Sequence, residues 1–366
     1  MSAYITALGI ANPPYKVLQK QLAHFMKKAH GLNEQEARGL DVLYRASGIK
    51  SRYSVIPDYS GSLVDNHLYP ISEDFEPFPS VASRMELYRK CALPLAKEAV
   101  LQAKSPVPYH EITHLITVSC TGMYAPGLDI DLVKALNLPT HVRRTCVNFM
   151  GCYAAITALK LAAEITSAHE HAKVLIVCVE LCSLHFQKQK TEDQLLANAL
   201  FGDGAAAVVV ESQPRGLCLS LEQFYADLAL EGEQEMAWNI GNFGFEMKLS
   251  QYVPDLIGKG IGTLTDNLLR FLKLKANEVS YYAIHPGGKR ILTEIEKALG
   301  LSKQANRFAY EVLEEFGNMS SPTVLFVLKK IWDSLQASDA GKTILSFAFG
   351  PGLTMESMLL KVHTTH

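Results

Sequence analysis

The chain has 366 residues, of which 48% are hydrophobic and 20% charged, and its formal net charge is −2. This length is enough to bury a large core or to form two domains. The near-zero charge gives no electrostatic basis for binding nucleic acid or an anionic membrane. No apolar run reaches the ~18 residues that a membrane span needs, and the N-terminus shows no secretory signal pattern.

The seven cysteines are an odd number and include no Cys-x-x-Cys pair. This usage favours neither a disulfide framework nor a metal site, so we expect no metal. A chain without disulfides fits a reducing compartment, and we expect a cytoplasmic protein.

The first hundred residues contain three predicted regular elements and one predicted loop. Residues 4–8 read as a short strand, and an Asn-Pro-Pro turn follows at 12–14. Apolar spacing predicts helix over 18–43 and again over 85–103. Between them, 53–80 is rich in Pro, Ser and Asp, which predicts a long surface loop.

The next hundred residues alternate strands and helices. Residues 174–179 are apolar at every position, as a strand covered on both faces requires. The other predicted elements are a strand at 115–119, helices at 128–136 and 193–200, and a strand at 205–210.

The second half repeats this order of elements. The pattern predicts strands at 281–284, 343–349 and 353–360, with helices at 290–299 and 322–335. Two similar halves follow from the repetition, with a boundary near 220–233. We therefore divide the chain into domains at 1–225 and 226–366.

The turn around Cys152 carries the first candidate for chemistry. Gly151 permits a tight bend, and the alanine-rich stretch after Cys152 predicts a helix that starts there. The unpaired N–H groups and dipole of a helix start favour an anion, so we expect a lowered thiol pKa and a nucleophile. The alternative is an ordinary core cysteine.

Two further polar residues end predicted elements in the second half. His285 ends a strand beside Gly287 and Gly288, which leave room for a ligand, and Asn318 precedes a helix. A cysteine nucleophile needs an orienting base and an oxyanion stabiliser, and these residues suit both tasks. Read singly, His285 is a satisfied structural histidine and Asn318 a helix N-cap.

Five blocks of sequence resemble the signatures of type III polyketide synthases, the chalcone synthase family. They are Gly151-Cys152, the Phe-Gly-Asp-Gly-Ala-Ala-Ala run at 201–207, the His-Pro-Gly-Gly run at 285–288, the Gly-Asn-Met-Ser-Ser run at 317–321 and the Gly-Pro-Gly-Leu-Thr run at 350–354. The similarity spans nearly the whole chain. The stretch 238–247 is more similar to bacterial members than to plant members.

The resemblance implies an α/β protein of the thiolase fold, with duplicated βαβαβαββ halves in αβαβα layers, acting as a homodimer. It implies iterative condensation of malonyl-CoA onto an acyl-CoA starter, then cyclisation to a pyrone, resorcinol or phloroglucinol-type product. Cys152 would carry the acyl chain, paired with His285, and His285 with Asn318 would hold the malonyl thioester. Phe201 would guard the coenzyme A tunnel, and no cofactor is required.

Several cavity positions depart from the plant pattern. Met247 stands in place of a second guarding phenylalanine and Trp238 in place of a glycine. Threonines are replaced by Cys120, Cys182 and His185, whereas Ser320 is retained, and we expect all of these to line the cavity. The basic residues that grip coenzyme A phosphates are unmatched. Lys50 with Arg52, or Lys289 with Arg290, would take their place.

Two other functions stay open at this point. A ketoacyl synthase that initiates fatty-acid synthesis shares Cys, His and Asn, although the His-Pro-Gly-Gly and Gly-Asn-Met-Ser-Ser blocks argue against it. A noncatalytic thioester-binding paralogue is the second, although Cys152, His285 and Asn318 are all present.

Overall fold

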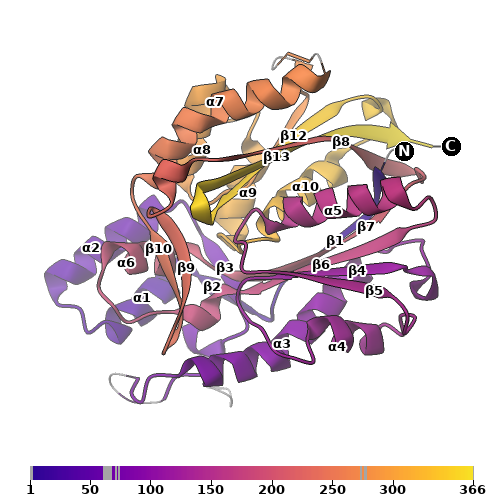
Figure 1. Ribbon diagram of the computed structural model, residues 1–366. Helices are drawn as coiled ribbons and strands as arrows, with labels where there is room; N and C mark the ends of the chain where they lie inside the picture. Colours follow the sequence, from indigo (N-terminus) through magenta and orange to yellow (C-terminus); the bar gives the residue numbers. More distant parts are fainter. Residues whose placement is uncertain are drawn as a thin grey trace.

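Figure 1 shows a computed structural model of the chain. It describes residues 3–60, 68–70, 72, 75–272, 274–275 and 278–365. Within these ranges, no helix is both long and apolar enough to cross a membrane.

A mixed sheet runs through the molecule in the order β11-β12-β13-β8-β1-β7-β6-β4-β5. Its strands are β1 (Ala3–Ala11), β4 (His114–Ser119), β5 (Arg143–Asn148), β6 (Lys173–Leu181), β7 (Asp203–Glu211), β8 (Leu217–Leu228), β11 (Tyr281–Ile284), β12 (Thr343–Gly350) and β13 (Thr354–Thr364).

The strand pairings confirm that the two halves repeat one topology. In the first half β4 pairs parallel with β6, and β6 with β7 and β7 with β1 pair antiparallel. In the second half β11–β12 is parallel, and β12–β13 and β13–β8 are antiparallel. The halves join where β1 pairs with β8. The predicted boundary between residues 225 and 226 falls inside β8, and the division into domains there stays a prediction.

Helices form three layers around the two halves of the sheet (Figure 1). The central helices α5 (Ala154–Ala168) and α10 (Thr323–Ser334) contact strands of both halves. Helices α3 (Val81–Gln102) and α4 (Leu128–Ala135) cover the outer face of the first half. Helices α7 (Val253–Leu272) and α8 (Lys289–Leu299) cover that of the second. The expected αβαβα layering is thus confirmed.

Strand β6 shows why the sheet needs cover on both faces. Val174 and Ile176 belong to the core shared with α5 and α10, whereas Leu175 and Val177 belong to the core beneath α3. All four side chains are at most 1% exposed. The continuous apolar run that predicted this strand follows from burying both faces.

A smaller group of elements flanks one end of the sheet. It comprises β2 (Tyr15–Leu18), β3 (Ser51–Ser54), α1 (Gln19–Ala29), α2 (Glu34–Ala46), α6 (Glu192–Leu200) and the hairpin of β9 (Met236–Gly241) and β10 (Gly244–Leu249). In Figure 1, α1, α2, α6 and the β9–β10 hairpin lie at the left of the molecule, with β2 and β3 nearer its centre. Helix α9 (Arg307–Phe316) contacts both β3 and β11.

Two predictions for the first hundred residues are wrong. The helix over 18–43 is two helices, because Gly31 has φ +55° and Asn33 caps α2 by accepting from the N–H groups of Gln35 and Glu36. The stretch 53–80 is not a surface loop where it is described, since Ile56 and Tyr59 are at most 3% exposed in an aromatic core. Residues 61–67, 71, 73 and 74 of that stretch lie outside the described residues.

Sequence patterns missed the paired strands β2 and β3, strands β5 and β8, the β9–β10 hairpin, and helices α7 and α9. Strand β5 is exposed at most positions, so it lacks an apolar signal. Helix α7 contains three glycines, which lower helix propensity. One of them, Gly260, lets α7 pack closely, because an added Cβ would lie 2.7 Å from Met355 Cε.

The close approach of β1 to the end of α3 gives a stability prediction. A Cβ added at Gly9 would lie 2.1 Å from the Ala103 backbone nitrogen, whereas one at Gly39, inside α2, has nothing within 4 Å. We expect Gly9→Ala to destabilise the protein by at least about 2 kcal/mol. Gly39→Ala should stabilise it by about 0.5–1 kcal/mol. Thermal melting of both variants checks this, and an unchanged melting temperature for Gly9→Ala would contradict it.

Candidate active site

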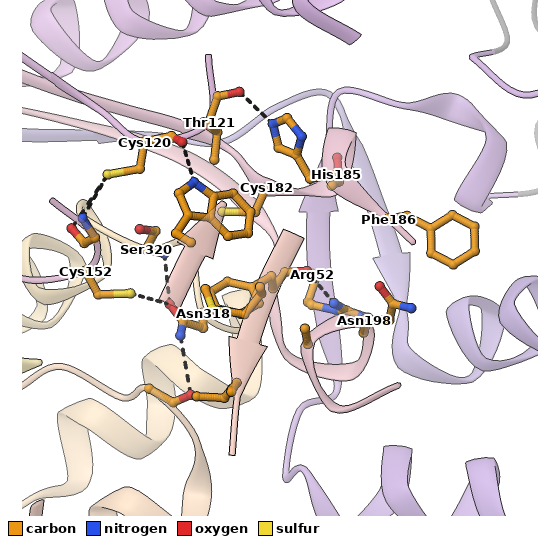
Figure 2. A pocket seen from close by; sticks show the side chains of 18 of the residues that line it. Arg52, Cys120, Thr121, Cys152, Cys182, His185, Phe186, Asn198, Asn318 and Ser320 are labelled. Carbon is orange, nitrogen blue, oxygen red and sulfur yellow. Dashed lines mark hydrogen bonds between the residues drawn. The ribbon is translucent and has the colours of Figure 1, made fainter. Parts of the chain in front are cut away.

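A cavity opens where the two halves meet the flanking group, with an empty volume of about 1130 Å³ including its mouth. All predicted site residues except Lys50, Lys289 and Arg290 line it. They are Arg52, Cys120, Cys152, Cys182, His185, Phe201, Trp238, Met247, His285, Gly287, Asn318 and Ser320. Figure 2 shows the cavity with Cys152 and Asn318 at one side.

Cys152 is held at the contact between the halves. Gly151 has φ +89°, and a Cβ there would lie 2.4 Å from Pro351 Cδ of the second half, so only glycine fits. Helix α5 begins at Ala154, two residues after the cysteine. The Cys152 Sγ donates to Asn318 Oδ1 at 4.0 Å (Figure 2).

The Cys152 thiol does not have the lowered pKa that we expected from its place before a helix. Burial raises the pKa of the thiol to about 12, and the charge of Glu180 also raises it. Hydrogen bonds to Ser320 and Asn318 offset only part of this rise. Desolvation therefore outweighs the helix start, and the thiol is protonated in this structure.

His285 is a buried base whose ring has no partner. Its backbone N–H donates to Phe347 O at 2.8 Å, which fixes it at the end of β11. The side chain is 1% exposed, and neither ring nitrogen has a hydrogen-bond partner among the described residues. Burial lowers the pKa of His285 to about 3, so its ring is neutral. Such an unsatisfied group is costly and suggests a place for substrate.

Asn318 links the halves through its backbone and faces the cavity with its amide. Its N–H donates to Leu200 O and its carbonyl accepts from Gly202 N–H, both at 2.9 Å. Its Nδ2 donates to Gly287 O at 3.3 Å, and its Oδ1 accepts from the Ser320 N–H at 2.8 Å. Helix α10 begins later, with Pro322 as its N-cap, so the N-cap interpretation of Asn318 is wrong.

Glu180 is a buried carboxyl that sequence reasoning missed; it does not line the cavity but holds Cys120 and Thr121, which do. It is fully buried and accepts hydrogen bonds from the Cys120 N–H at 2.9 Å, the Thr121 hydroxyl at 2.8 Å and the Ser321 hydroxyl at 2.6 Å. Burial raises its pKa to about 7. A lone carboxylate at the end of an otherwise apolar strand was the available signal.

His185 and Trp238 build the cavity wall. The Thr121 carbonyl can only accept, so His185 Nε2 donates to it at 2.7 Å, while Nδ1 accepts from the Phe245 N–H at 2.9 Å. Burial lowers the pKa of His185 to about 3. The Trp238 Nε1–H donates to Cys120 O at 2.7 Å. Because these ring groups are already bonded, they shape the cavity and do not serve as a second base.

Three other predicted wall residues have distinct settings. The Cys120 Sγ accepts from the Gly151 N–H at 3.0 Å, so it supports the nucleophile turn. Ser320 has φ +57°, which is uncommon for a residue other than glycine. In this conformation its backbone N–H donates to Asn318 Oδ1. Met247 lies opposite Trp238 in the β9–β10 hairpin.

Three of the basic residues expected near coenzyme A, Arg52, Lys50 and Arg290, are already paired within the protein. Arg52 is buried and donates to Phe201 O, to Asn198 O at 2.9 Å and to Gln19 Oε1 at 3.1 Å, which fixes Phe201 in the wall. Lys50 pairs with Glu314, and Arg290 Nη2 pairs with Asp255 Oδ1 at 2.9 Å. Neither Lys50 nor Arg290 lines the cavity, and their contact with coenzyme A phosphates stays a prediction.

The arrangement suits acyl transfer through sulfur. A thiol, a neutral imidazole and an amide N–H donor meet in a mostly apolar pocket, which supplies a nucleophile, a base and donors for an oxyanion. In the described ranges, no group of three or more His, Cys, Asp or Glu side chains is placed to hold a metal ion.

Comparisons with known proteins agree with this chemistry. Residues 1–214 match the N-terminal domain and residues 221–364 the C-terminal domain of chalcone and stilbene synthases. The alpha-pyrone synthesis polyketide synthase-like protein of Mycobacterium tuberculosis is 33% identical over 80% of this chain and 77% of its own length.

Two solved structures share the whole fold. PKS-I from the brown alga Ectocarpus siliculosus superposes with a TM-score of 0.93 at 32% identity, covering 98% of each chain. The C-terminal type III polyketide synthase domain of Steely1 from Dictyostelium superposes with a TM-score of 0.90 at 28% identity, covering 99% of each.

Alkylation of Cys152 by iodoacetamide tests whether His285 is its base. If His285 takes the thiol proton directly, thiolate and imidazolium form together without loss of a proton to solvent, and we expect a rate nearly independent of pH between about 6 and 9. In His285→Ala the thiol must ionise alone with a pKa of about 12, and the rate should rise about tenfold per pH unit. Peptide mass spectrometry measures both profiles.

His185→Gln is the matched control for that experiment, since His185 lines the same cavity with both nitrogens bonded. Its profile should stay flat. A wild-type rate that also rises tenfold per pH unit would remove His285 from this role.

The buried carboxyl of Glu180 predicts a pH dependence of stability. Its pKa is about 7 in the folded protein and about 4.3 in an unfolded chain. Its contribution is therefore fully present below the unfolded value and lost as the pH rises through 7. Glu180→Gln, which stays neutral, should gain about 3 kcal/mol relative to wild type between pH 4 and 8. Denaturant unfolding at several pH values measures this, and a constant difference would contradict it.

Proposed function

Because the chain belongs to the chalcone and stilbene synthase family of type III polyketide synthases, which are acyltransferases, we propose that it extends an acyl-CoA starter with malonyl-CoA by iterative decarboxylative Claisen condensation. One observation carries the proposal. The Cys152 thiol of the first half faces Asn318 of the second, in a cavity that His285 lines with an unpartnered ring.

In the loading step, Cys152 becomes the acyl carrier. His285 takes the thiol proton as Sγ attacks the thioester carbonyl of the starter, and coenzyme A leaves as the thiol. The buried site favours this route, because a free thiolate is disfavoured there until the base receives its proton. The acyl group then stays on Sγ as a thioester.

In the extension step, malonyl-CoA loses its carboxylate as carbon dioxide. The electron pair of the broken carbon–carbon bond moves onto the thioester oxygen as an enolate, which His285 and the Asn318 amide stabilise by donating hydrogen bonds. The enolate carbon attacks the acyl group on Cys152, and the thiolate leaves. The chain, longer by two carbons, is now a coenzyme A thioester; Sγ attacks its carbonyl, coenzyme A leaves, and the chain is again bound to Cys152 for the next round.

Ring closure releases a pyrone, resorcinol or phloroglucinol-type product. The mycobacterial relative is named for alpha-pyrone synthesis, and this favours a pyrone as the product. We further propose that the enzyme is a cytoplasmic homodimer that needs no cofactor, as the resemblance implies.

The two rival functions predict different behaviour. A ketoacyl synthase of fatty-acid initiation would require an acyl carrier protein, and a thioester-binding paralogue would release no carbon dioxide from malonyl-CoA. Family membership along both parts of the chain argues against the first. The free imidazole of His285 argues against the second.

Asn318→Ala separates loading from decarboxylation. Only His285 is needed to activate the thiol, whereas both donors meet the enolate. We expect the variant to load a radiolabelled starter on Cys152 yet to release carbon dioxide about 10²–10³-fold more slowly. Cys152→Ala should make no product at all.

Asn198→Ala is the control, because Asn198 lines the cavity with its side chain bonded to Gln187 O at 3.1 Å. It should decarboxylate at nearly the wild-type rate. If Asn318→Ala loses loading as completely as decarboxylation, Asn318 is a structural residue.

A further inference from the structure

The β9–β10 hairpin supplies one wall of the cavity. Its two strands form a small sheet of their own, separate from the nine-stranded sheet (Figure 1). Two cross-strand pairs of the hairpin, Met236 with Leu249 and Trp238 with Met247, line the cavity. The position of this wall therefore depends on the contacts that hold the hairpin against the rest of the protein.

Side chains hold the edge of β10 that faces away from β9. An edge strand presents backbone N–H and C=O groups that need partners. The carbonyls of Phe243 and Phe245 both accept from Gln187 Nε2, each at 3.2 Å. The Phe245 N–H donates to His185 Nδ1 at 2.9 Å. These side chains thus bond to β10 where a further strand would otherwise pair.

Gln187 is the one of these edge-bonding side chains that lies outside the cavity. His185 and Gln194 line the cavity, and Gln194 Nε2 donates to Met247 O at 3.0 Å. Gln187 does not line it and is 3% exposed. An amide nitrogen carries two hydrogens, and two hairpin carbonyls accept from that of Gln187. Gln187 therefore bonds to the hairpin without bordering the space for substrate.

The turn of the hairpin approaches its surroundings closely at Gly244. This residue has φ +116°, and a Cβ there would lie 3.0 Å from Arg84 Cδ and 3.2 Å from Gln187 Nε2. Beside it, the Asn242 carbonyl accepts from the Val81 N–H at 2.9 Å. The turn is therefore fixed against the start of α3 and against the Gln187 side chain.

Loss of the Gln187 amide would leave two hairpin carbonyls without their donor. An acceptor that loses its partner on docking disfavours the docked position. Trp238 and Met247 move with the hairpin, so the wall that they form would be less fixed. The hydrogen bonds of Gln187 go to the hairpin and to Asn198, not to Cys152 or Asn318, so the reacting groups would stay in place.

We infer that Gln187 is a positioning residue for chain extension. By holding the β9–β10 hairpin, it fixes Trp238 and Met247 as a wall and so sets the space open to the growing polyketide. This inference rests on the proposed function. It predicts that loss of the Gln187 amide changes the length of the product while the reaction at Cys152 continues.

Hydrogen exchange of Gln187→Met tests the hold on the hairpin. Methionine is unbranched and flexible, so it fills the space of glutamine but donates no hydrogen bond. We expect the amides of residues 236–249 to exchange about 5- to 150-fold faster, because two carbonyls lose their donor. Peptide mass spectrometry measures this exchange. Unchanged exchange over 236–249 would overturn the inference.

Thr166→Val is the matched control. Thr166 is 0% exposed, and its hydroxyl is shared between Ala162 O at 3.0 Å and Ala163 O at 3.1 Å, both within α5. The variant loses a buried side-chain donor to two carbonyls, as Gln187→Met does, but inside a helix. Its exchange over 236–249 and its products should match wild type. An equal rise in this control would mean a general loss of stability and would also overturn the inference.

Gly244→Ala displaces the hairpin by a second route. The added Cβ would meet Arg84 and Gln187, and a φ of +116° is strained for alanine. We expect faster exchange over 236–249 and altered products although the Gln187 amide is present. The variant also tests the position of the hairpin if Gln187→Met does not fold. Wild-type exchange and products in Gly244→Ala would count against the inference.

Product length is the functional measurement. Malonyl-CoA is supplied with acetyl-CoA or benzoyl-CoA, one small and one large starter, and the products are separated and weighed by mass spectrometry. We expect Gln187→Met to release carbon dioxide within about twofold of the wild-type rate, because the reacting groups do not share its hydrogen bonds. The range of product lengths should widen. A loosened hairpin that still gives wild-type lengths would contradict the inference.

Binding separates this inference from the proposed function. In Cys152→Ala, calorimetry compares the affinities for benzoyl-CoA and acetyl-CoA with and without Gln187→Met. If wild type releases no carbon dioxide, but Gln187→Met loosens the hairpin and changes this affinity ratio, the proposed function fails while the hold of Gln187 on the wall stands. If carbon dioxide is released and neither the ratio nor the product lengths change, the inference alone fails.

Discussion

The site depends on a short stretch of backbone pairing between the halves. Asn318 exchanges hydrogen bonds with Leu200 and Gly202, and this pairing sets the Asn318 amide opposite the Cys152 thiol. Two glycines make it possible. A Cβ at Gly317, where φ is +69°, would lie 2.8 Å from Leu200 O, and one at Gly202 would lie 3.1 Å from Phe316 O. The glycines of both motifs thus serve the approach of one half to the other.

Burial is the second constraint, because it keeps the titratable groups of the site neutral. It raises the pKa of Cys152 and of Glu180 and lowers the pKa of His285 and of His185. Of these groups, His285 alone keeps both polar ring atoms unbonded within the described structure. Burying this ring without hydrogen bonds costs free energy, and a substrate that bonds to it offsets that cost. Substrate binding and chemistry are therefore favoured at this point of the cavity.

Features that repeat along the chain, or that lie within one short motif, could be predicted from the sequence. The apolar run of β6, the repeated element order and the glycine-flanked Cys152, His285 and Asn318 each have a local cause, and each lies where it was expected. The setting of Glu180 depends on groups distant in the chain, such as Ser321. The pKa of Cys152 is raised, rather than lowered by the helix start, because of the depth at which the thiol is buried. Neither could be read from the local sequence. The β9–β10 hairpin was missed because its burial is irregular, with Asn239 and Ile240 both exposed.

Within the cavity, some polar side chains are hydrogen-bonded within the protein, whereas the ring of His285 is not. Near Cys152 the second half contributes an imidazole without partners, so a thioester oxygen finds donors there. Toward Phe186 the hydroxyls of Tyr59 and Ser183 donate hydrogen bonds within the protein, so these two donors are occupied before a substrate enters. The ring nitrogens of His285 are still unbonded, so the cavity offers them to a substrate beside the nucleophile. A thioester that bonds there is held with its reacting carbon near Cys152, which favours reaction at this point.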